Sequence, residues 1–286
     1  MIFYKTSSFG NDFIEIDCRD LPAAAADSAG LKAALAKEIC DRQRGVGADG
    51  TVFYRVGKQG VHFEIFNRDG GAAELSGNGM AGLAVVLFQR RLAASPLRLH
   101  TAVGSRRIDL LARRGPVFQL DVEIGRPDFS QRRFFPFLMD KQESSCCAGL
   151  KFFPVSVGNP HAVVLCRDRL APGRMAAMGK KLESHPMFPE RVNVEFVHFS
   201  SAKKPPVGKA ALRPASCRVF FYERGVGPTM ASSTGSAAVF AVLRRLGKVQ
   251  DRLTIDCGAD KIAVSWKQGI FVHNFTRLIC RGNYFG

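Results

Sequence analysis

Short runs in which apolar and polar residues alternate extend along most of this chain. Residues 51–56 (TVFYRV), 118–124 (FQLDVEI) and 217–223 (CRVFFYE) are examples, with β-branched or aromatic side chains at many apolar positions. Such runs, separated by glycine, proline or asparagine, are typical of β-strands. Further strands are expected over residues 1–6, 13–17, 61–66, 97–103, 151–157, 161–166, 192–199, 253–257, 261–266, 270–275 and 277–282.

Four segments have the longer apolar spacing that is typical of helices. They are residues 31–44, 80–93, 169–185 and 236–247, and Pro172 with Gly173 breaks the third near its start. The strands and these helices together predict an α+β fold.

The helices at 80–93 and 236–247 belong to an internal repeat. When the sequence is shifted by 156 residues, residues 68–87 align with residues 224–243, and each copy follows a strand and opens a helix. We therefore expect two similar α+β domains, each with a central helix. Seven of the twenty aligned positions are identical: Arg68/Arg224, Gly71/Gly227, Ser76/Ser232, Gly79/Gly235, Ala81/Ala237, Val86/Val242 and Leu87/Leu243.

Ser76 and Ser232 stand at the start of the two repeated helices. A helix N-terminus has unpaired N–H groups and a partial positive charge, so it can bind a carboxylate. If both helices face one pocket, their first side chains would flank a substrate carbon from opposite sides, which suits inversion of a stereocentre. Serine is also a preferred N-cap without any chemistry, so the motif alone leaves both interpretations open.

Composition and charge limit the classes of partner that the protein is expected to bind. Hydrophobic residues make up 46% of the 286 positions, and no run reaches the ~20 residues of a membrane span. The net charge of +16 comes from scattered doublets without interleaved aromatic residues, which favours a basic surface over nucleic-acid binding. The eight cysteines lack C-x-x-C spacing, and no export signal is visible. We expect a cytoplasmic protein with neither a nucleic-acid nor a membrane partner.

Six blocks of sequence resemble, in order, the signature blocks of diaminopimelate epimerases. They are GNDFIEID, DRQRGVGADG, FNRDGGAAELSGNG, VGNPHAVV, RVNVEF and YERGVGPTMASSTGS, and they extend from Asn11 to Ser236. The resemblance implies two pseudo-symmetric domains, each a mixed β-sheet or barrel wrapped around a central helix. We accordingly expect a first domain of residues 1–115 with 268–286 and a second domain of residues 116–267.

The resemblance also implies an activity and a site. The family converts LL- to meso-diaminopimelate, a lysine and peptidoglycan precursor, without pyridoxal phosphate, metal or other cofactor, and often as a homodimer. The substrate is a small zwitterionic amino acid. Its distal end would be bound by Asn67, Asn193, Glu223 and Arg224, with contributions from Asn11 and Asn159. Its reacting end would lie on the backbone N–H groups of Gly77, Asn78, Ser233 and Thr234.

The chain departs from the family where the chemistry occurs. Ser76 and Ser232 occupy the positions of the two acid/base cysteines, and Ser233 stands where the family has glycine. A thiol of pKa ~8.5 can supply a thiolate near neutral pH, whereas a hydroxyl is a useful base only when a partner takes its proton. The candidate partners are Asp69, Glu74 and His161. Two further pairs differ from the family: Ala81–Gly82 replaces Arg-Cys, and Asn274–Phe275 replaces Gly-Pro.

Three functions therefore stay open at this stage. The first is a cofactor-independent amino-acid isomerase with Ser76 and Ser232 on opposite faces of the substrate. The second is a related lyase or isomerase that acts on another small amino or hydroxy acid with one base. The third is a catalytically silent amino-acid-binding protein. The idea that serines were introduced to trap substrate is disfavoured by Ser233, because a minimal change would have kept the glycine.

Overall fold

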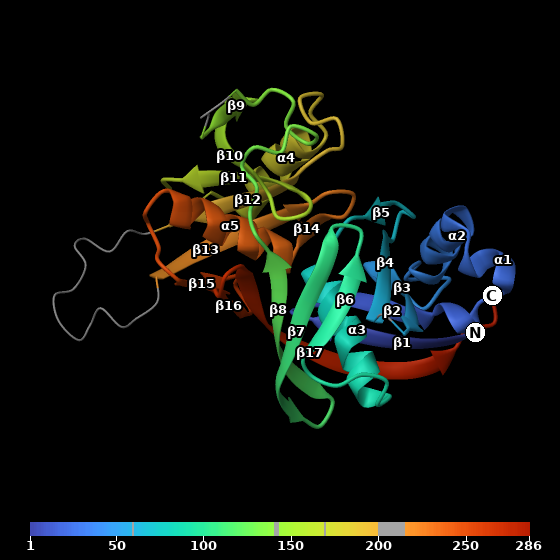
Figure 1. Ribbon diagram of the computed structural model, residues 1–286. Helices are drawn as coiled ribbons and strands as arrows, with labels where there is room; N and C mark the ends of the chain where they lie inside the picture. The colour runs from blue at the N-terminus through green and yellow to red at the C-terminus, as the bar shows by residue number, and fades with distance from the viewer. Residues whose placement is uncertain (59, 140–142, 169, 200–214) are drawn as a thin grey trace. The chain divides into compact units, whose positions relative to one another are not determined.

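A computed structural model of the chain describes residues 1–286 except 59, 140–142, 169 and 200–214 (Figure 1). The chain forms two units, one of Met1–Glu123 with His273–Gly286 and one of Ile124–Val272. The strands of the first unit are β1 (Ile2–Ser8), β2 (Asn11–Asp17), β3 (Gly50–Gly57), β4 (Gly60–Asn67), β5 (Ala72–Ala73), β6 (Leu97–Thr101), β7 (Gly104–Arg114), β8 (Val117–Gly125) and β17 (Ile270–Asn283). Its helices are α1 (Ala23–Ala26), α2 (Ala29–Ile39) and α3 (Gly77–Gln89), with a 3₁₀ turn at Cys18–Asp20.

Eight of the described strands in the first unit close into a ring. The order is β17, β1, β2, β3, β4, β6, β7 and β8, and β8 pairs again with β17. Helix α3 connects β4 to the parallel strand β6 and runs inside the strands of its unit (Figure 1). All residues from Gly77 to Leu87 are buried. A helix that is apolar on every side must be covered on every side, and the ring of strands does this.

The second unit repeats this connectivity. Its strands are β9 (Ser145–Cys147), β10 (Leu150–Ser156), β11 (Pro160–Cys166), β12 (Asn193–His198), β13 (Ala215–Glu223), β14 (Gly227–Thr229), β15 (Arg252–Asp256) and β16 (Lys261–Trp266), and its helices are α4 (Pro172–Glu183) and α5 (Ser233–Arg245). From β10 to β16 the pairings alternate between antiparallel and parallel, as they do from β1 to β7. Residues Ser233–Leu243 of α5 are buried. Each unit is thus a mixed sheet around a central helix, as expected.

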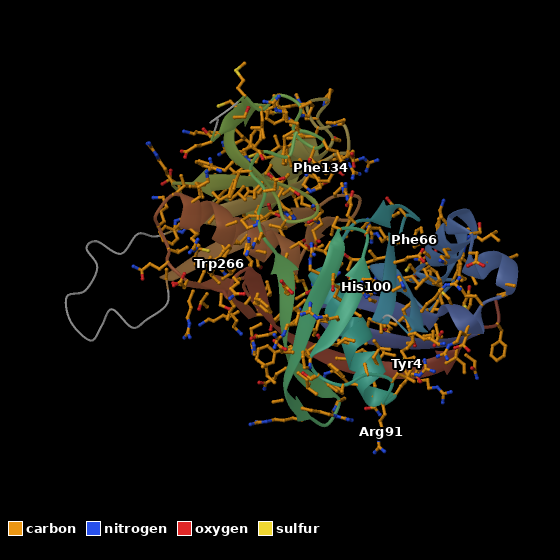
Figure 2. The ribbon with its side chains drawn as sticks, viewed as in Figure 1. Tyr4, Phe66, Arg91, His100, Phe134 and Trp266 are labelled. Atoms are coloured by element: carbon orange, nitrogen blue, oxygen red, sulfur yellow. The ribbon has the colours of Figure 1, made fainter. Side chains whose placement is uncertain are left out.

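Aromatic side chains fill much of each core outside the central helices. In the first unit Phe53 and Phe66 pack edge to face with ring centroids 5.7 Å apart. In the second unit Phe135 and Phe188 do the same at 6.2 Å, next to Phe134. Figure 2 labels Phe66 on β4 and Phe134 before β9. Such pairs add packing energy to the area that they bury.

Three expectations about elements need correction. Helices α3 and α5 begin at Gly77 and Ser233, three residues earlier than the apolar runs predicted, because the serine before each start caps the first turn. The long strand β7 was not expected, because four of its eleven residues are arginines and hide the alternation. Within the expected helix at 169–185, α4 begins at Pro172, a residue that suits the first turn, and Arg169 lies outside the described residues.

Candidate functional site

The start of α3 carries the first group of predicted site residues. Ser76 has an extended backbone, and its Oγ accepts a hydrogen bond from the Gly79 N–H at 3.1 Å. This cap satisfies one of the N–H groups of the first turn, while those of Gly77 and Asn78 point out of the helix N-terminus. Ser76 itself is partly exposed. The first unit thus presents a hydroxyl and a partial positive charge at one end of its buried helix.

The start of α5 has the same backbone geometry in a more enclosed setting. Ser232 Oγ accepts from the Gly235 N–H at 3.2 Å, as Ser76 does from Gly79. Only 2% of Ser232 is exposed, and Ser233 and Thr234 are buried next to it. A buried hydroxyl without hydrogen-bond partners costs free energy, so the Ser232 hydroxyl depends on protein partners more than the partly exposed Ser76 hydroxyl does.

Ser232 has a carboxylate as its neighbour. Its hydroxyl donates to Glu223 Oε2 at 3.2 Å, and Thr229 donates to the other oxygen, Oε1, at 2.6 Å. Burial raises the pKa of Glu223 to about 7, although both hydrogen bonds act to lower it. Near neutral pH the carboxyl group therefore exists in both protonation states, which suits a group that accepts and returns a proton.

A buried polar chain extends from Ser232 in the other direction. Ser232 Oγ is 3.4 Å from Thr234 Oγ1, which accepts from Asn159 Nδ2 at 3.5 Å. Asn159 Oδ1 is 2.9 Å from Nε2 of His161, and Nδ1 of His161 is 2.7 Å from Glu195 Oε1. The ring of His161 thus bonds to Asn159 through one nitrogen and to Glu195 through the other, and it fixes the orientation of the Asn159 amide.

The remaining predicted residues of the second unit lie beside this chain. Arg224 donates its backbone N–H to Asn193 Oδ1 at 3.0 Å, and its guanidinium donates to the Glu190 carbonyl at 3.0 Å. Asn193 Nδ2 in turn donates to the Pro160 carbonyl at 2.8 Å. The second unit therefore brings together all seven of its predicted site residues: Asn159, Asn193, Glu223, Arg224, Ser232, Ser233 and Thr234.

The first unit brings its predicted residues together less completely. Asn78 Nδ2 donates to Asn11 Oδ1 at 3.1 Å, and Asn11 Nδ2 donates to Asp49 Oδ2 at 2.8 Å. Asn67 ends β4, where its backbone N–H and carbonyl close a turn with Gly71 and Gly70. The expectation that Ser76 and Ser232 face one pocket stays a prediction.

One departure from the family has a local explanation. A Cβ at Gly82 in α3 would overlap Glu15 Oε1 and Thr6 Oγ1. Glu15 is 0% exposed, accepts from Thr6 Oγ1 at 2.5 Å, and leaves its Oε2 unpartnered within the described part of the chain. Burial raises the pKa of Glu15 well above its usual range. Glu15 and Thr6 therefore leave room only for glycine at position 82.

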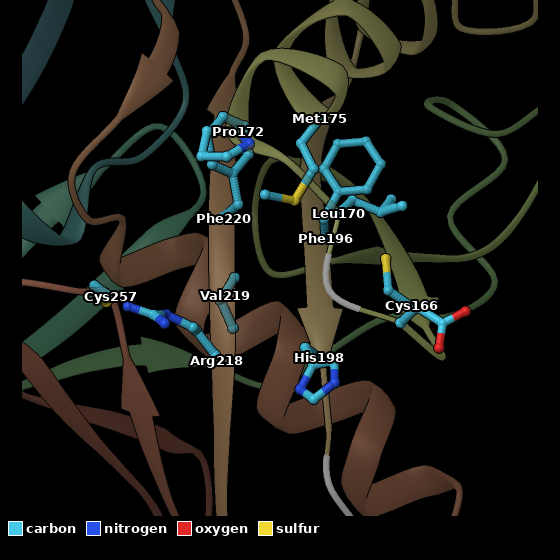
Figure 3. Close-up of a pocket in the computed structure, with 11 residues that line it drawn as sticks. Cys166, Leu170, Pro172, Met175, Phe196, His198, Arg218, Val219, Phe220 and Cys257 are labelled. Atoms are coloured by element: carbon cyan, nitrogen blue, oxygen red, sulfur yellow. The ribbon is translucent and has the colours of Figure 1, made fainter.

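A separate cavity lies within the second unit (Figure 3). Its volume is about 410 Å³, and its walls are mainly apolar, with His198, Arg218 and two thiols among them. None of the predicted site residues lines it. Among the described residues there is no group of three or more His, Cys, Asp or Glu side chains that could hold a metal ion, and no helix is long and apolar enough to cross a membrane.

Two features of the site were not expected from the sequence. The candidate proton acceptors for the serines were Asp69, Glu74 and His161, whereas the carboxylate bonded to Ser232 is that of Glu223. In the internal repeat Glu223 aligns with Asn67, so only the second copy has a carboxylate at this position. This difference could have pointed to Glu223. The bond of Asn274 to Asn78 across 196 residues of sequence was not expected either.

Comparisons with known proteins agree with this architecture. A family model described as diaminopimelate epimerase matches residues 3–129 and 153–270. The diaminopimelate epimerase of Carboxydothermus hydrogenoformans is 31% identical over 294 residues, which cover 100% of both chains. That of Microcystis aeruginosa is 32% identical over 280 residues, which cover 93% of this chain and 91% of the relative.

Solved structures share the fold at lower identity. A hydroxyproline epimerase from Agrobacterium vitis superposes with a TM-score of 0.66 at 17% identity and covers 100% of this chain and 91% of its own. A methylitaconate-delta-isomerase superposes with a TM-score of 0.62 at 13% identity and covers 99% and 95%, respectively. With the family model matched over most of its length, this chain belongs to the diaminopimelate epimerase family.

Proposed function

We propose that this protein is a cofactor-independent amino-acid epimerase that interconverts LL- and meso-diaminopimelate. Its relatives over the full length of the chain are named for this activity. The observation that carries the proposal is the hydrogen bond from Ser232 to Glu223, because it supplies the proton acceptor that a hydroxyl needs.

In this proposal Ser232 and Glu223 remove the proton from the substrate. The Cα–H bond breaks, its proton moves to Ser232 Oγ, and the original hydroxyl proton moves to Glu223 Oε2. The electron pair stays on the substrate as a carbanion conjugated with the α-carboxylate. The N-terminal turns of the helices bind this carboxylate and stabilise the developing charge through their N–H groups.

Ser76 delivers a proton to the opposite face of Cα. Its Oγ already accepts the Gly79 N–H, and this bond strengthens as the oxygen becomes negative when it gives up its proton. The proton on Ser76 is then restored from solvent, and Glu223 returns its proton to solvent. Arg224, Asn193 and Asn67 would hold the distal carboxylate and ammonium groups, since amides and a guanidinium suit a zwitterion. The resemblance assigned Glu223 to this distal end as well, but its bond to Ser232 gives it the role of proton acceptor in this proposal.

Deuterium incorporation tests the proposal. Purified protein at high concentration is incubated with LL-diaminopimelate in D₂O, and NMR follows both deuterium at Cα and formation of the meso isomer. We expect both, with a faster rate in the S76C/S232C variant, whose thiols are stronger acids. Calorimetric binding of diaminopimelate without exchange, in the wild-type protein and in this variant, would replace the proposal with a binding function.

One observation favours a second candidate, a one-base isomerase or lyase. Ser232 has a carboxylate neighbour, whereas Asn67 occupies the equivalent place in the first unit. A one-base enzyme would exchange the Cα proton of one isomer only and would not form the other. Loss of water from a panel of hydroxy-amino acids, in the absence of epimerisation, would establish this alternative.

The proposal also includes a cytoplasmic homodimer, by analogy with the family. Light scattering coupled to size-exclusion chromatography measures the mass of the assembly directly. A mass of 31.3 kDa, that of one chain, across the working range of concentration would exclude the dimer.

A further inference from the structure

Asn274 is a buried side chain for which the proposed mechanism has no role. It lies on β17, is 0% exposed, and occupies a position where the sequence departs from the family motif. Its Nδ2 donates to Asn78 Oδ1 at 3.1 Å, and its Oδ1 accepts from Thr276 Oγ1 at 3.0 Å. Asn274 therefore contacts the second residue of α3, two positions after Ser76.

These bonds are part of a longer chain of side chains inside the first unit. On one side Asn78 donates to Asn11 at 3.1 Å, and Asn11 donates to Asp49 at 2.8 Å. On the other side Thr276 is 2.7 Å from Ser8 Oγ. The members are at most 8% exposed apart from Asp49, whose carboxylate also accepts from Arg42 at 2.8 Å.

The carboxylate at the end fixes the direction of every bond in the chain. Asp49 accepts from Arg42, from the Asp12 N–H and from Asn11, so Asn11 turns its NH₂ group toward Asp49 and its carbonyl oxygen toward Asn78. Asn78 must then donate to Asn11, so its own oxygen needs a donor, and Asn274 Nδ2 supplies that donor. Reversing any one amide would place two acceptors or two donors against each other in a buried site, which is costly.

We propose that Asn274 is a positioning residue that fixes the start of α3 for catalysis. By holding Asn78 at its oxygen, it sets the orientation of the Asn78 and Asn11 amides and the place of the first turn that carries Ser76. This inference rests on the proposed function, in which Gly77 and Asn78 bind the reacting end of the substrate. Proton transfer is sensitive to displacements of about 1 Å, so loosening this turn should lower turnover.

The substitution Asn274→Asp tests the direction of the chain with almost no change in shape. An ionised aspartate cannot donate to Asn78, whereas a protonated one can. We expect kcat/KM for epimerisation to fall roughly tenfold to a hundredfold relative to wild type at pH 8. The ratio of N274D to wild type should recover as the pH is lowered to 6, because burial raises the pKa of the new carboxyl.

Asn283→Asp is the matched control, since it makes the same change at an exposed position of the same strand. Its ratio to wild type should stay near one at every pH. A merely structural role for Asn274 would lower the unfolding midpoint of N274D but leave kcat/KM of the folded protein unchanged at 25 °C. An unchanged kcat/KM, or a loss that N283D shares, would overturn the inference.

A second variant covers the case in which N274D does not fold. Thr276→Val removes the donor to Asn274 Oδ1, and Thr276→Ser retains it, so we expect a severalfold loss in the first and rescue in the second. If wild-type protein shows no exchange, the proposed function fails, and calorimetric binding of diaminopimelate decides the inference instead. Weaker binding in N274D but not in N283D would then support it, and equal or absent binding would overturn it.

Discussion

The two units hold the same helix start in different chemical surroundings. In the second unit, buried Ser232 donates to Glu223, whereas in the first unit Ser76 is partly exposed and Asn67 occupies the place equivalent to Glu223. The capping bond to the third helical residue is nevertheless 3.1 Å in one unit and 3.2 Å in the other. The repeated backbone thus supplies two similar helix starts with different side chains around them. In the proposed conversion of LL- to meso-diaminopimelate, this difference makes Ser232 the proton acceptor and Ser76 the proton donor.

The buried acids beside the two central helices differ as well. Strand β11 with β12 in the second unit corresponds to β2 with β3 in the first unit, and Asn159 corresponds to Asn11. In this correspondence His161 takes the place of Phe13, and Glu195 takes the place of Val52. In the second unit His161 bonds to both Glu195 and Asn159 and orients the Asn159 amide. In the first unit the acid is Glu15, whose partner is the Thr6 hydroxyl and whose charge is suppressed by burial. A chain of hydrogen-bonded side chains leads from the start of each central helix to a carboxyl group. It ends at Asp49 in the first unit and at Glu195 in the second.

Removing one hydroxyl at a time gives the largest expected difference between the units. S232A should lower kcat/KM by roughly 10²–10⁴, the range for loss of a general base, and should abolish deuterium exchange from LL-diaminopimelate. S76A should also block formation of the meso isomer but should retain exchange at the starting Cα, because Ser232 and Glu223 still remove that proton. Exchange rates measured by NMR check both, and equal loss of exchange in the two variants would contradict the division of roles.

The pH dependence of activity sharpens the same comparison. Glu223 accepts a proton only when ionised, so kcat/KM should rise as the pH increases through about 7 and level off above it. E223Q should lower kcat/KM by about 10²-fold and remove this rise. Asn67→Gln, which keeps the amide and adds one methylene at the equivalent position, should leave the rise in place. A wild-type profile that is flat between pH 6 and 8 would exclude Glu223 as the acceptor.

The packing of α3 against Glu15 gives a smaller effect, on stability. G82A should lower the free energy of unfolding by about 1–3 kcal/mol, because the new methyl group overlaps Glu15 and Thr6. In an E15A background the same substitution should cost less, because only the overlap with Thr6 remains. Urea unfolding of the four proteins of this double-mutant cycle measures the difference. Additive costs would show that Gly82 is not fixed by Glu15.

The smallest effect concerns the charge of Glu15. Its pKa is raised in the folded protein, so the folded state keeps a proton that the unfolded state loses above pH ~4.3. Its contribution to stability is therefore full at lower pH and is lost as the pH rises, by at most ~1.4 kcal/mol per pH unit. E15Q should show a flatter dependence of the unfolding free energy on pH than wild type. Parallel curves would mean that Glu15 ionises normally.

Local sequence patterns were enough to predict the central helices and most of the strands of the two repeated units. The apolar runs after Ser76 and Ser232 predicted the two central helices, although the structure begins each of them three residues earlier, directly after the capping serine. The alternating runs predicted most strands of both units. These features follow from local rules of periodicity and capping, which act over a few residues. The six family blocks likewise depend only on the order of residues along the chain. Strand β7 was not predicted, because its arginines interrupt the alternation of apolar and polar residues.

Only the tertiary structure decided which polar side chains meet. The bond between Ser232 and Glu223, the His161–Glu195 pair across 34 residues and the contact of Asn274 with Asn78 across 196 residues depend on which strands become neighbours. The fit of Gly82 against Glu15 depends on how a helix sits inside its ring of strands. The order of the strands and the direction of their side chains are set when the strands pack around the two central helices. Local sequence patterns do not encode this packing.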